Sequence, residues 1–259
     1  MRGVLAGLAL LLFLMALATH TAHANDVLEE VSTRPGVKVP VYWMPRPGAK
    51  GTLVLLPGGA GSIGVLAAGK PSGSNFLVRS RDLFAAAGYN VALVSRPTDK
   101  KDLTHAERIG AEHMQDLQAV LAFLRRVSRA PIWLVGNSRG TISATAAALA
   151  FGDQLAGMVL TSSITDGKPG AVGRQNLGGI HIPTLVVHHA KDACDVCPPE
   201  EAKVIFNKLR NAPVRKLIML DGGGPPTGPE CESMHWHGYA GMEREAVNAI
   251  LNWIAHPVP

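Results

Sequence analysis

Short apolar runs alternate with amphipathic stretches along most of the chain. The apolar runs are rich in Val, Leu and Ile and end at Gly, Pro, Asn or Ser, as buried strands do. Residues 106–127 carry Leu and Val on one stripe at helical spacing and predict a long helix. The predicted strands are a pair around Pro35-Gly36, then Thr52–Leu56, Asn90–Ser95, Pro131–Val135, Leu155–Leu160, Thr184–Val187 and Arg215–Leu220. The predicted helices are Asn75–Ala87, Ala106–Val127, Thr141–Phe151, Glu200–Leu209 and Arg244–Ile254. This alternation predicts a mostly parallel sheet with helices on both faces.

The predicted elements form one domain, residues 25–259. No shift in composition marks a boundary inside this range, and its length suits one sizeable hydrophobic core. The only candidate insertion is residues 162–182, which is short and rich in glycine. We therefore expect a single domain with little or no cap.

The first 24 residues have the pattern of a secretory signal peptide. Arg2 precedes an apolar run, Val4–Ala18, and small residues surround the end at Ala24. The alternative is a membrane anchor, but this run is shorter than the roughly 20 apolar residues that span a bilayer. We expect cleavage after Ala24, a periplasmic or secreted protein, and no stable membrane anchor once the segment is removed.

Composition excludes two broad classes. Hydrophobic residues make up 47% of the chain and charged residues 17%, which is typical of a globular protein and argues against long disorder. The formal net charge is +5, but the Lys and Arg residues are scattered and show no aromatic-interleaved basic patch. We expect no nucleic-acid partner.

The sequence GNSRG lies between a predicted strand and a predicted helix. In a G-x-S-x-G motif with this context, the serine occupies a sharp strand-to-helix turn, and glycines on either side let the two elements approach. The turn lifts the hydroxyl out of the sheet, and the helix N-terminus favours developing negative charge. Ser138 is therefore the candidate nucleophile.

A nucleophilic serine needs a base and an acid that orients the base. His237 precedes the last predicted helix and is the candidate base; His235 is the alternative. Asp192 follows the strand Thr184–Val187 and is the candidate acid. Asp195 and Asp166 are the alternatives for the acid.

Two backbone N–H groups should stabilise the oxyanion. One is that of Arg139, the residue after the candidate nucleophile. The other comes from the PGGAG loop after Thr52–Leu56, with Gly59 as the first choice and Ala60 as the second. The loop could also cradle a phosphate, but the G-x-x-x-x-G-K-[ST] pattern does not follow it.

Together, the PGG loop, GNSRG, the Asp of HHAKD and the His of HGY resemble the α/β-hydrolase superfamily, in particular its serine esterases. They occur in the order of that superfamily, and the resemblance covers nearly all of residues 25–259. It implies a three-layer fold with an eight-stranded, mostly parallel sheet, and acyl transfer to water without a cofactor or a metal. The sequence departs from many members at Pro57, where they carry His, and at His189, where they often carry Gly.

The resemblance also implies a pairing for two of the three cysteines. If the triad forms, the acid loop and the histidine loop meet, and a Cys194–Cys231 disulfide would join them in an oxidising compartment. Pairing of Cys197 with Cys231 is the alternative. The three cysteines and a histidine could instead bind zinc, and Cys194-x-x-Cys197 could be a redox pair, although it does not open a helix after a first strand as such pairs do.

These observations predict an exported serine hydrolase that cleaves a small carboxylic ester through an acyl-serine intermediate. A thioesterase, an amidase or an acyltransferase could use the same triad. The alternatives from other classes are a non-catalytic binding protein on this scaffold and a metal-dependent enzyme built on the Cys/His cluster. The sequence assigns neither a particular acyl chain nor an oligomeric state.

Overall fold

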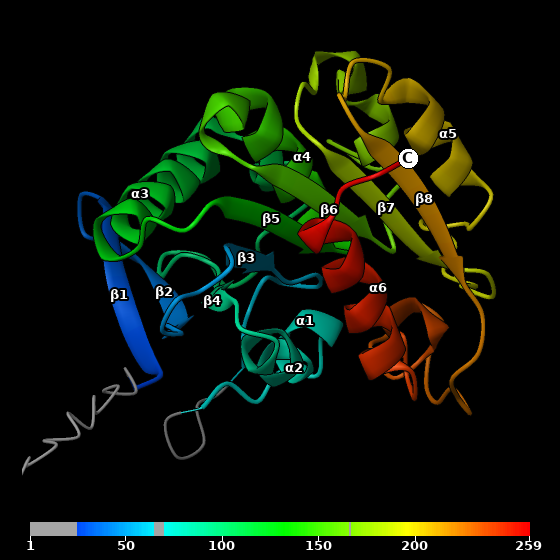
Figure 1. The fold of residues 1–259 in the computed structure, drawn as a ribbon, viewed down its shortest axis with the longest axis horizontal. Coiled ribbons are helices and arrows are strands. Elements are labelled where there is room, and N and C mark those ends of the chain that lie inside the picture. The colour runs from blue at the N-terminus through cyan, green and yellow to red at the C-terminus, as the bar shows by residue number, and fades with distance from the viewer. Residues whose placement is uncertain (1–24, 65–69, 166) are drawn as a thin grey trace, which may run out of the picture.

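One eight-stranded sheet runs through the computed structural model, which describes residues 25–64, 70–165 and 167–259 (Figure 1). The strands are β1 (Val27–Arg34), β2 (Val37–Met44), β3 (Thr52–Leu56), β4 (Asn90–Val94), β5 (Ile132–Asn137), β6 (Gly157–Thr161), β7 (Thr184–His189) and β8 (Arg215–Leu220). Their order in the sheet is β1-β2-β4-β3-β5-β6-β7-β8. Strands β1 and β2 pair antiparallel, as do β2 and β4, and all other pairs are parallel. The predicted signal peptide, 1–24, lies outside the described residues.

Helices cover both faces of the sheet and make three layers. Helices α1 (Phe76–Arg79), α2 (Arg81–Ala86) and α6 (Glu243–Ala255) pack on one face, and α3 (Ala111–Val127), α4 (Arg139–Phe151) and α5 (Glu201–Lys208) pack on the other (Figure 1). Each face has its own apolar cluster, because the central strands are buried on both sides. The predicted fold class, a three-layer sandwich with a mostly parallel sheet, is confirmed.

Two predicted helices are broken. The segment predicted as Asn75–Ala87 divides at Ser80, which ends α1 and precedes α2. The segment predicted as Ala106–Val127 begins with a 3₁₀ turn, η1 (Glu107–Ile109), and Gly110 then adopts an extended conformation, with φ −75° and ψ 156°, before α3 starts. The apolar stripe lies entirely within α3, so periodicity alone could not reveal the turn before it.

The connections above the parallel strands are compact. The connection from β6 to β7 contains only two described 3₁₀ turns, η3 (Val172–Arg174) and η4 (Leu177–Gly179), and that from β8 to α6 contains η5 (Trp236–Gly238). Within the described ranges, no helical cap stands over the sheet. Likewise, no helix in this part of the chain is both long enough and apolar enough to cross a membrane. Residues that follow β3, β5 and β7 meet at the carboxyl edge of the sheet, where the candidate site lies.

Candidate active site

Ser138 occupies the turn between β5 and α4. Its backbone has φ 52° and ψ −126°, an uncommon conformation for a residue with a side chain, and the residue is only partly buried. Helix α4 starts at the next residue, so the N-terminal end of its dipole lies beside the hydroxyl. The predicted strand–turn–helix context of GNSRG is present.

Glycines surround Ser138 because backbones approach one another there. A Cβ atom on Gly136 would lie 2.8 Å from Thr141 Cα, and one on Gly140 would collide with the carbonyl oxygen of Leu56. A Cβ on Gly58 would lie 2.7 Å from that of Ser138. The loop after β3 is therefore packed directly against the candidate nucleophile.

Asp192 and His237 form a buried hydrogen bond. Asp192 follows β7, His237 lies in η5, and their side chains meet with 2.9 Å between Asp192 Oδ2 and His237 Nδ1. Both residues are 3% exposed. The other carboxylate oxygen, Oδ1, accepts the Cys194 N–H at 3.1 Å. Although burial raises the pKa of Asp192, hydrogen bonds from His188 and His237 outweigh it and lower the value to about 2.

The ionised acid determines which nitrogen of His237 is free. A carboxylate only accepts hydrogen bonds, so Nδ1 of His237 donates to Asp192. In the neutral form of the ring, the lone pair is therefore on Nε2. Nε2 is buried and has no hydrogen-bond partner within the described part of the chain. Ser138 and His237 line the same cavity, of about 300 Å³, but no hydrogen bond joins them. Such contacts are often long in unliganded sites.

A second imidazole contacts the same carboxylate. His188 Nε2 lies 3.3 Å from Asp192 Oδ2 and 2.9 Å from the carbonyl oxygen of Cys197, to which it donates. His188 is fully buried at the end of β7. The Asp192 carboxylate therefore accepts the N–H groups of Cys194 and His237, and it lies close to a third N–H, that of His188, which donates to Cys197. No sequence motif predicts this place for His188.

The two predicted oxyanion donors line the cavity that contains Ser138. Gly59 has φ 53°, and its N–H donates to no acceptor among the residues described. Arg139 is the first residue of α4, so its N–H has no partner within the helix. The Arg139 side chain turns away to Asp102, 3.3 Å from Nη1 to Oδ1.

Neither His235 nor Asp195, two of the alternatives for the base and the acid, forms an acid–base contact with a described residue. His235 is half-buried, packs edge-on against Trp236 with 5.1 Å between ring centroids, and forms no ion pair with a described carboxylate. Asp195 is exposed beside the cavity and contacts no histidine among the described residues. Asp166 lies outside the described residues. The acid–base contact in this structure is the one between Asp192 and His237.

The sulfur atoms of Cys194 and Cys231 lie at bonding distance, 2.09 Å, and join the acid loop to the histidine loop. Cys197 is buried and free. Two groups of three possible metal ligands occur among the described residues: Cys194, Cys197 and His237, and Cys194, Asp195 and Cys231. Both groups use Cys194, whose sulfur cannot be a thiolate ligand while it is bonded to Cys231. The residues present therefore fit a disulfide and do not fit the zinc alternative.

Solved structures resemble the chain over most of its length. The match to a dienelactone hydrolase from Anabaena variabilis covers 92% of this chain and 100% of that enzyme's chain, with a TM-score of 0.66 and 14% sequence identity. Est1E from Butyrivibrio proteoclasticus covers 88% and 99%, with a TM-score of 0.61 and 14% identity. A serine hydrolase without a lid from Xanthomonas campestris covers 90% and 97%, with a TM-score of 0.59 and 16% identity. This chain has the α/β-hydrolase fold. Known family models do not match it, and neither do the sequences of curated proteins.

One further side chain of this α/β-hydrolase fold, which the helical pattern does not predict, lies behind the loop next to Ser138. Arg108 is 2% exposed and donates to the carbonyl oxygens of Pro57 and Gly59, in the loop packed against Ser138. The apolar stripe of residues 106–127 predicts that Arg108 lies on the long helix, as one of the scattered surface charges. The break at Gly110 could have given the signal, because a turn before α3 directs Arg108 differently from the helix that follows.

Proposed function

We propose that this protein is an exported serine hydrolase that cleaves a small carboxylic ester, with Ser138 as nucleophile, His237 as base and Asp192 as the acid that orients it. The observation that carries the proposal is the buried Asp192–His237 hydrogen bond of 2.9 Å, which leaves His237 Nε2 unpaired beside the cavity of Ser138. A free lone pair on a buried imidazole is what a serine hydroxyl needs for deprotonation.

In the acylation step, Ser138 Oγ attacks the carbonyl carbon of the ester while its proton moves to Nε2 of His237. The carbonyl oxygen becomes an oxyanion, and the N–H groups of Gly59 and Arg139 stabilise it. The tetrahedral intermediate then collapses: the bond to the alcohol oxygen breaks, and His237 returns its proton to that oxygen. Asp192 remains ionised and stabilises the imidazolium between the two transfers.

In the deacylation step, water takes the place of the alcohol. His237 removes a proton from the water molecule, whose oxygen attacks the acyl carbon of the acyl-serine. Collapse of the second intermediate returns the proton to Ser138 Oγ and releases the carboxylic acid. In each step, His237 takes up one proton and gives it back, so the protons balance.

The size of the cavity supports a small substrate. Its volume of about 300 Å³ is at the lower end for ligand pockets, and the described residues above the sheet form no cap. Among the similar structures, Est1E has been solved with ferulic acid bound. We propose a small carboxylic ester as the substrate class on these grounds.

Ser138→Ala tests the proposal. Wild type and variant are assayed on 4-nitrophenyl esters of increasing acyl length, and on matched thioesters and amides. The wild type should hydrolyse short esters best, and the variant should lose at least about 10³-fold in kcat/KM. A fluorophosphonate should label wild type and leave Ser138→Ala unlabelled. A wild type that neither reacts with the probe nor turns over any ester, thioester or amide would contradict the proposal and favour a binding protein on this fold.

Export has a test of its own. The full chain is expressed in a bacterium with a secretion system, and the N-terminus of the protein in the periplasm or medium is sequenced. We expect the mature chain to start at Asn25. Retention of the full-length chain in the cytoplasm or in the membrane fraction would contradict export, and would leave the proposed chemistry untouched.

A further inference from the structure

Arg108 is a buried cation behind the loop that follows β3. Its side chain donates to four neutral acceptors: the carbonyl oxygens of Leu103 (3.2 Å), Pro57 (3.3 Å) and Gly59 (3.1 Å), and the hydroxyl of Ser143 (3.0 Å). No carboxylate among the described residues forms an ion pair with the guanidinium. Burial lowers the pKa of Arg108 to about 9, so the group still carries its charge at neutral pH.

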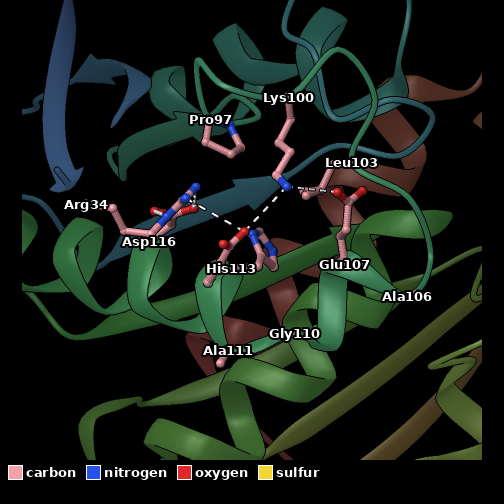
Figure 2. Close-up of a pocket in the computed structure, with 11 residues that line it drawn as sticks. Arg34, Pro97, Lys100, Leu103, Ala106, Glu107, Gly110, Ala111, His113 and Asp116 are labelled. Atoms are coloured by element: carbon pink, nitrogen blue, oxygen red, sulfur yellow. Dashed lines mark hydrogen bonds and ion pairs between the residues drawn. The ribbon is translucent and has the colours of Figure 1, made fainter. Parts of the chain in front are cut away.

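A buried charge without a counter-ion is costly, because the interior solvates it less well than water does. The neighbouring residue, Glu107, does not supply the missing charge. Its carboxylate accepts hydrogen bonds from the hydroxyl and the N–H of Thr104. It also pairs with the Lys100 ammonium at 3.0 Å (Figure 2). These contacts lower the pKa of Glu107 to about 2. Because a buried cation without a counter-ion is costly, we expect Arg108 to have a function here that a neutral side chain could not provide.

The acceptors of Arg108 identify that role. The Pro57 and Gly59 carbonyl oxygens are bound by Nη2, and the carbonyl oxygen between them, that of Gly58, accepts the Gly61 N–H at 3.0 Å. Three consecutive carbonyls of the loop are therefore fixed. The Gly59 N–H, in the middle of this set, is left without an acceptor and belongs to the cavity of Ser138.

Arg108 also connects this loop to the helix of the nucleophile. Nη1 donates to Ser143 Oγ on α4, the helix that starts just after Ser138, and Ser143 in turn contacts His113 Nε2 at 2.9 Å. Burial and the nearby charge of Arg108 lower the pKa of His113 to about 3, so this imidazole is neutral. A neutral ring can accept the Ser143 proton, which leaves the Ser143 oxygen free to accept from Arg108.

Ion pairs near the surface hold η1, the 3₁₀ turn that carries Arg108. Arg34 binds Asp116, with 2.8 Å from Nε to Oδ1, and Lys100 bridges Glu107 and Glu112 around a cavity of about 360 Å³ (Figure 2). Figure 2 shows these charged side chains converging from β1, from the loop before η1 and from α3. They fix η1 against α3 while Arg108 reaches inward from it.

We infer that Arg108 is a positioning residue for the oxyanion site: it binds the Pro57 and Gly59 carbonyls and so holds the Gly59 N–H at a fixed place relative to Ser138. The inference rests on the proposed function. Preorganised donors stabilise a developing oxyanion because they need not reorient during the reaction. Without the guanidinium, two carbonyls lose their donor and the loop can move away from Ser138.

Arg108→Met tests the inference, since methionine replaces the aliphatic part and removes all donors. Circular dichroism and thermal melting first establish that the variant is folded, and kinetics on 4-nitrophenyl acetate are corrected for the folded fraction. We expect kcat to fall about 100-fold, as for loss or displacement of one oxyanion donor, while KM changes little. Arg81→Met is the matched control, because Arg81 is also buried and donates to a carbonyl, that of Val78. Its kcat should stay at the wild-type level.

A second variant guards against misfolding. Arg108→Lys keeps a charge and hydrogen-bond donors, although it loses the fork geometry of the guanidinium, and its kcat should lie between those of wild type and Arg108→Met. A folded Arg108→Met with wild-type kcat would overturn the inference. So would loss of activity that follows the loss of folded protein in both Arg108 variants and in Arg81→Met. If wild type itself fails to react with the fluorophosphonate, the proposed function fails instead.

Discussion

The two halves of the candidate site are held by different forces. The acid–base half, residues 188–197 and 231–238, is fixed by the Cys194–Cys231 bond and by hydrogen bonds to an ionised carboxylate. The nucleophile half, residues 57–61 and 136–143, is fixed by close backbone packing at glycines and by the hydrogen bonds of a buried arginine to neutral oxygens.

This difference determines what can disturb each half. Acid and reductant act directly on the acid–base half, because its contacts contain a titratable carboxylate and a reducible bond. The nucleophile half depends on the volume of side chains and on the presence of a donor, which solvent conditions change little. Acid or a reductant should therefore disturb the acid–base half and leave the nucleophile half nearly unchanged. Substitutions should show how much each contact inside a half contributes.

The largest effect should come from Asp192→Asn. An amide cannot stabilise the imidazolium and favours the wrong tautomer of His237, so we expect kcat to fall by about 10³- to 10⁴-fold. Steady-state kinetics on a short ester measure the loss. Asp195→Asn is the control, since Asp195 lies beside the same cavity and contacts no described histidine. Equal losses in both variants would contradict the assignment of the acid.

The disulfide should have the next largest effect. Cys194 and Cys231 are 37 positions apart, and closing such a loop contributes about 3 to 4 kcal/mol in the chain-entropy model. Cys231→Ser should therefore lower the free energy of unfolding by that order in urea. Dithiothreitol should destabilise wild type to the level of the variant and leave Cys231→Ser unchanged. Stability of wild type that is insensitive to the reductant would mean that the bridge does not form.

Acid should remove a smaller part of the stability. The pKa of Asp192 is about 2 in the folded protein and 3.8 in its ordinary state, so its contribution is present above pH 4 and is lost as pH falls toward 2. This difference in pKa corresponds to about 2 kcal/mol in the free energy of unfolding. Urea unfolding of wild type and Asp192→Asn at pH 5 and at pH 2 measures it: the gap in stability between them should shrink by that amount. A constant gap would show that the carboxylate gains nothing from its partners.

The smallest effect should come from Asp102→Asn. This carboxylate pairs with the Arg139 side chain at 3.3 Å, and both groups are partly exposed, so the pair is worth about 0.2 to 1 kcal/mol. Thermal melting and ester kinetics should both stay near wild type. A large loss of kcat would mean that this surface pair, and not the buried contacts of Arg108, holds the nucleophile half in place.

Local sterics made parts of this site predictable. A strand that runs into G-x-S-x-G and then into a helix constrains its own geometry, so Ser138 and its turn could be expected without any distant contact. The position of His237 just before the last helix and of Asp192 just after β7 follows from chain order in a parallel sheet. The Cys194–Cys231 pair followed only once these two loops were expected to meet.

Other features depended on contacts between distant segments. Arg108 lies in a stretch that reads as the first turn of an amphipathic helix, and only the extended Gly110 separates it from α3. His188 directly follows the predicted strand Thr184–Val187, and its contact with Asp192 depends on how the acid loop folds back over β7. A side chain whose partners lie on other elements leaves no periodic signal in the sequence.

The buried third cysteine has a consequence for producing the protein. Burial raises the pKa of the Cys197 thiol well above its usual range, and nearby Asp192 and Asp195 raise it further, so in the folded state it stays protonated and a poor nucleophile. Before folding, however, all three thiols compete on equal terms, and a chain oxidised too early can trap the wrong pair. Yield from an oxidising host should therefore rise with added disulfide isomerase, whereas material already folded should keep its pairing through storage.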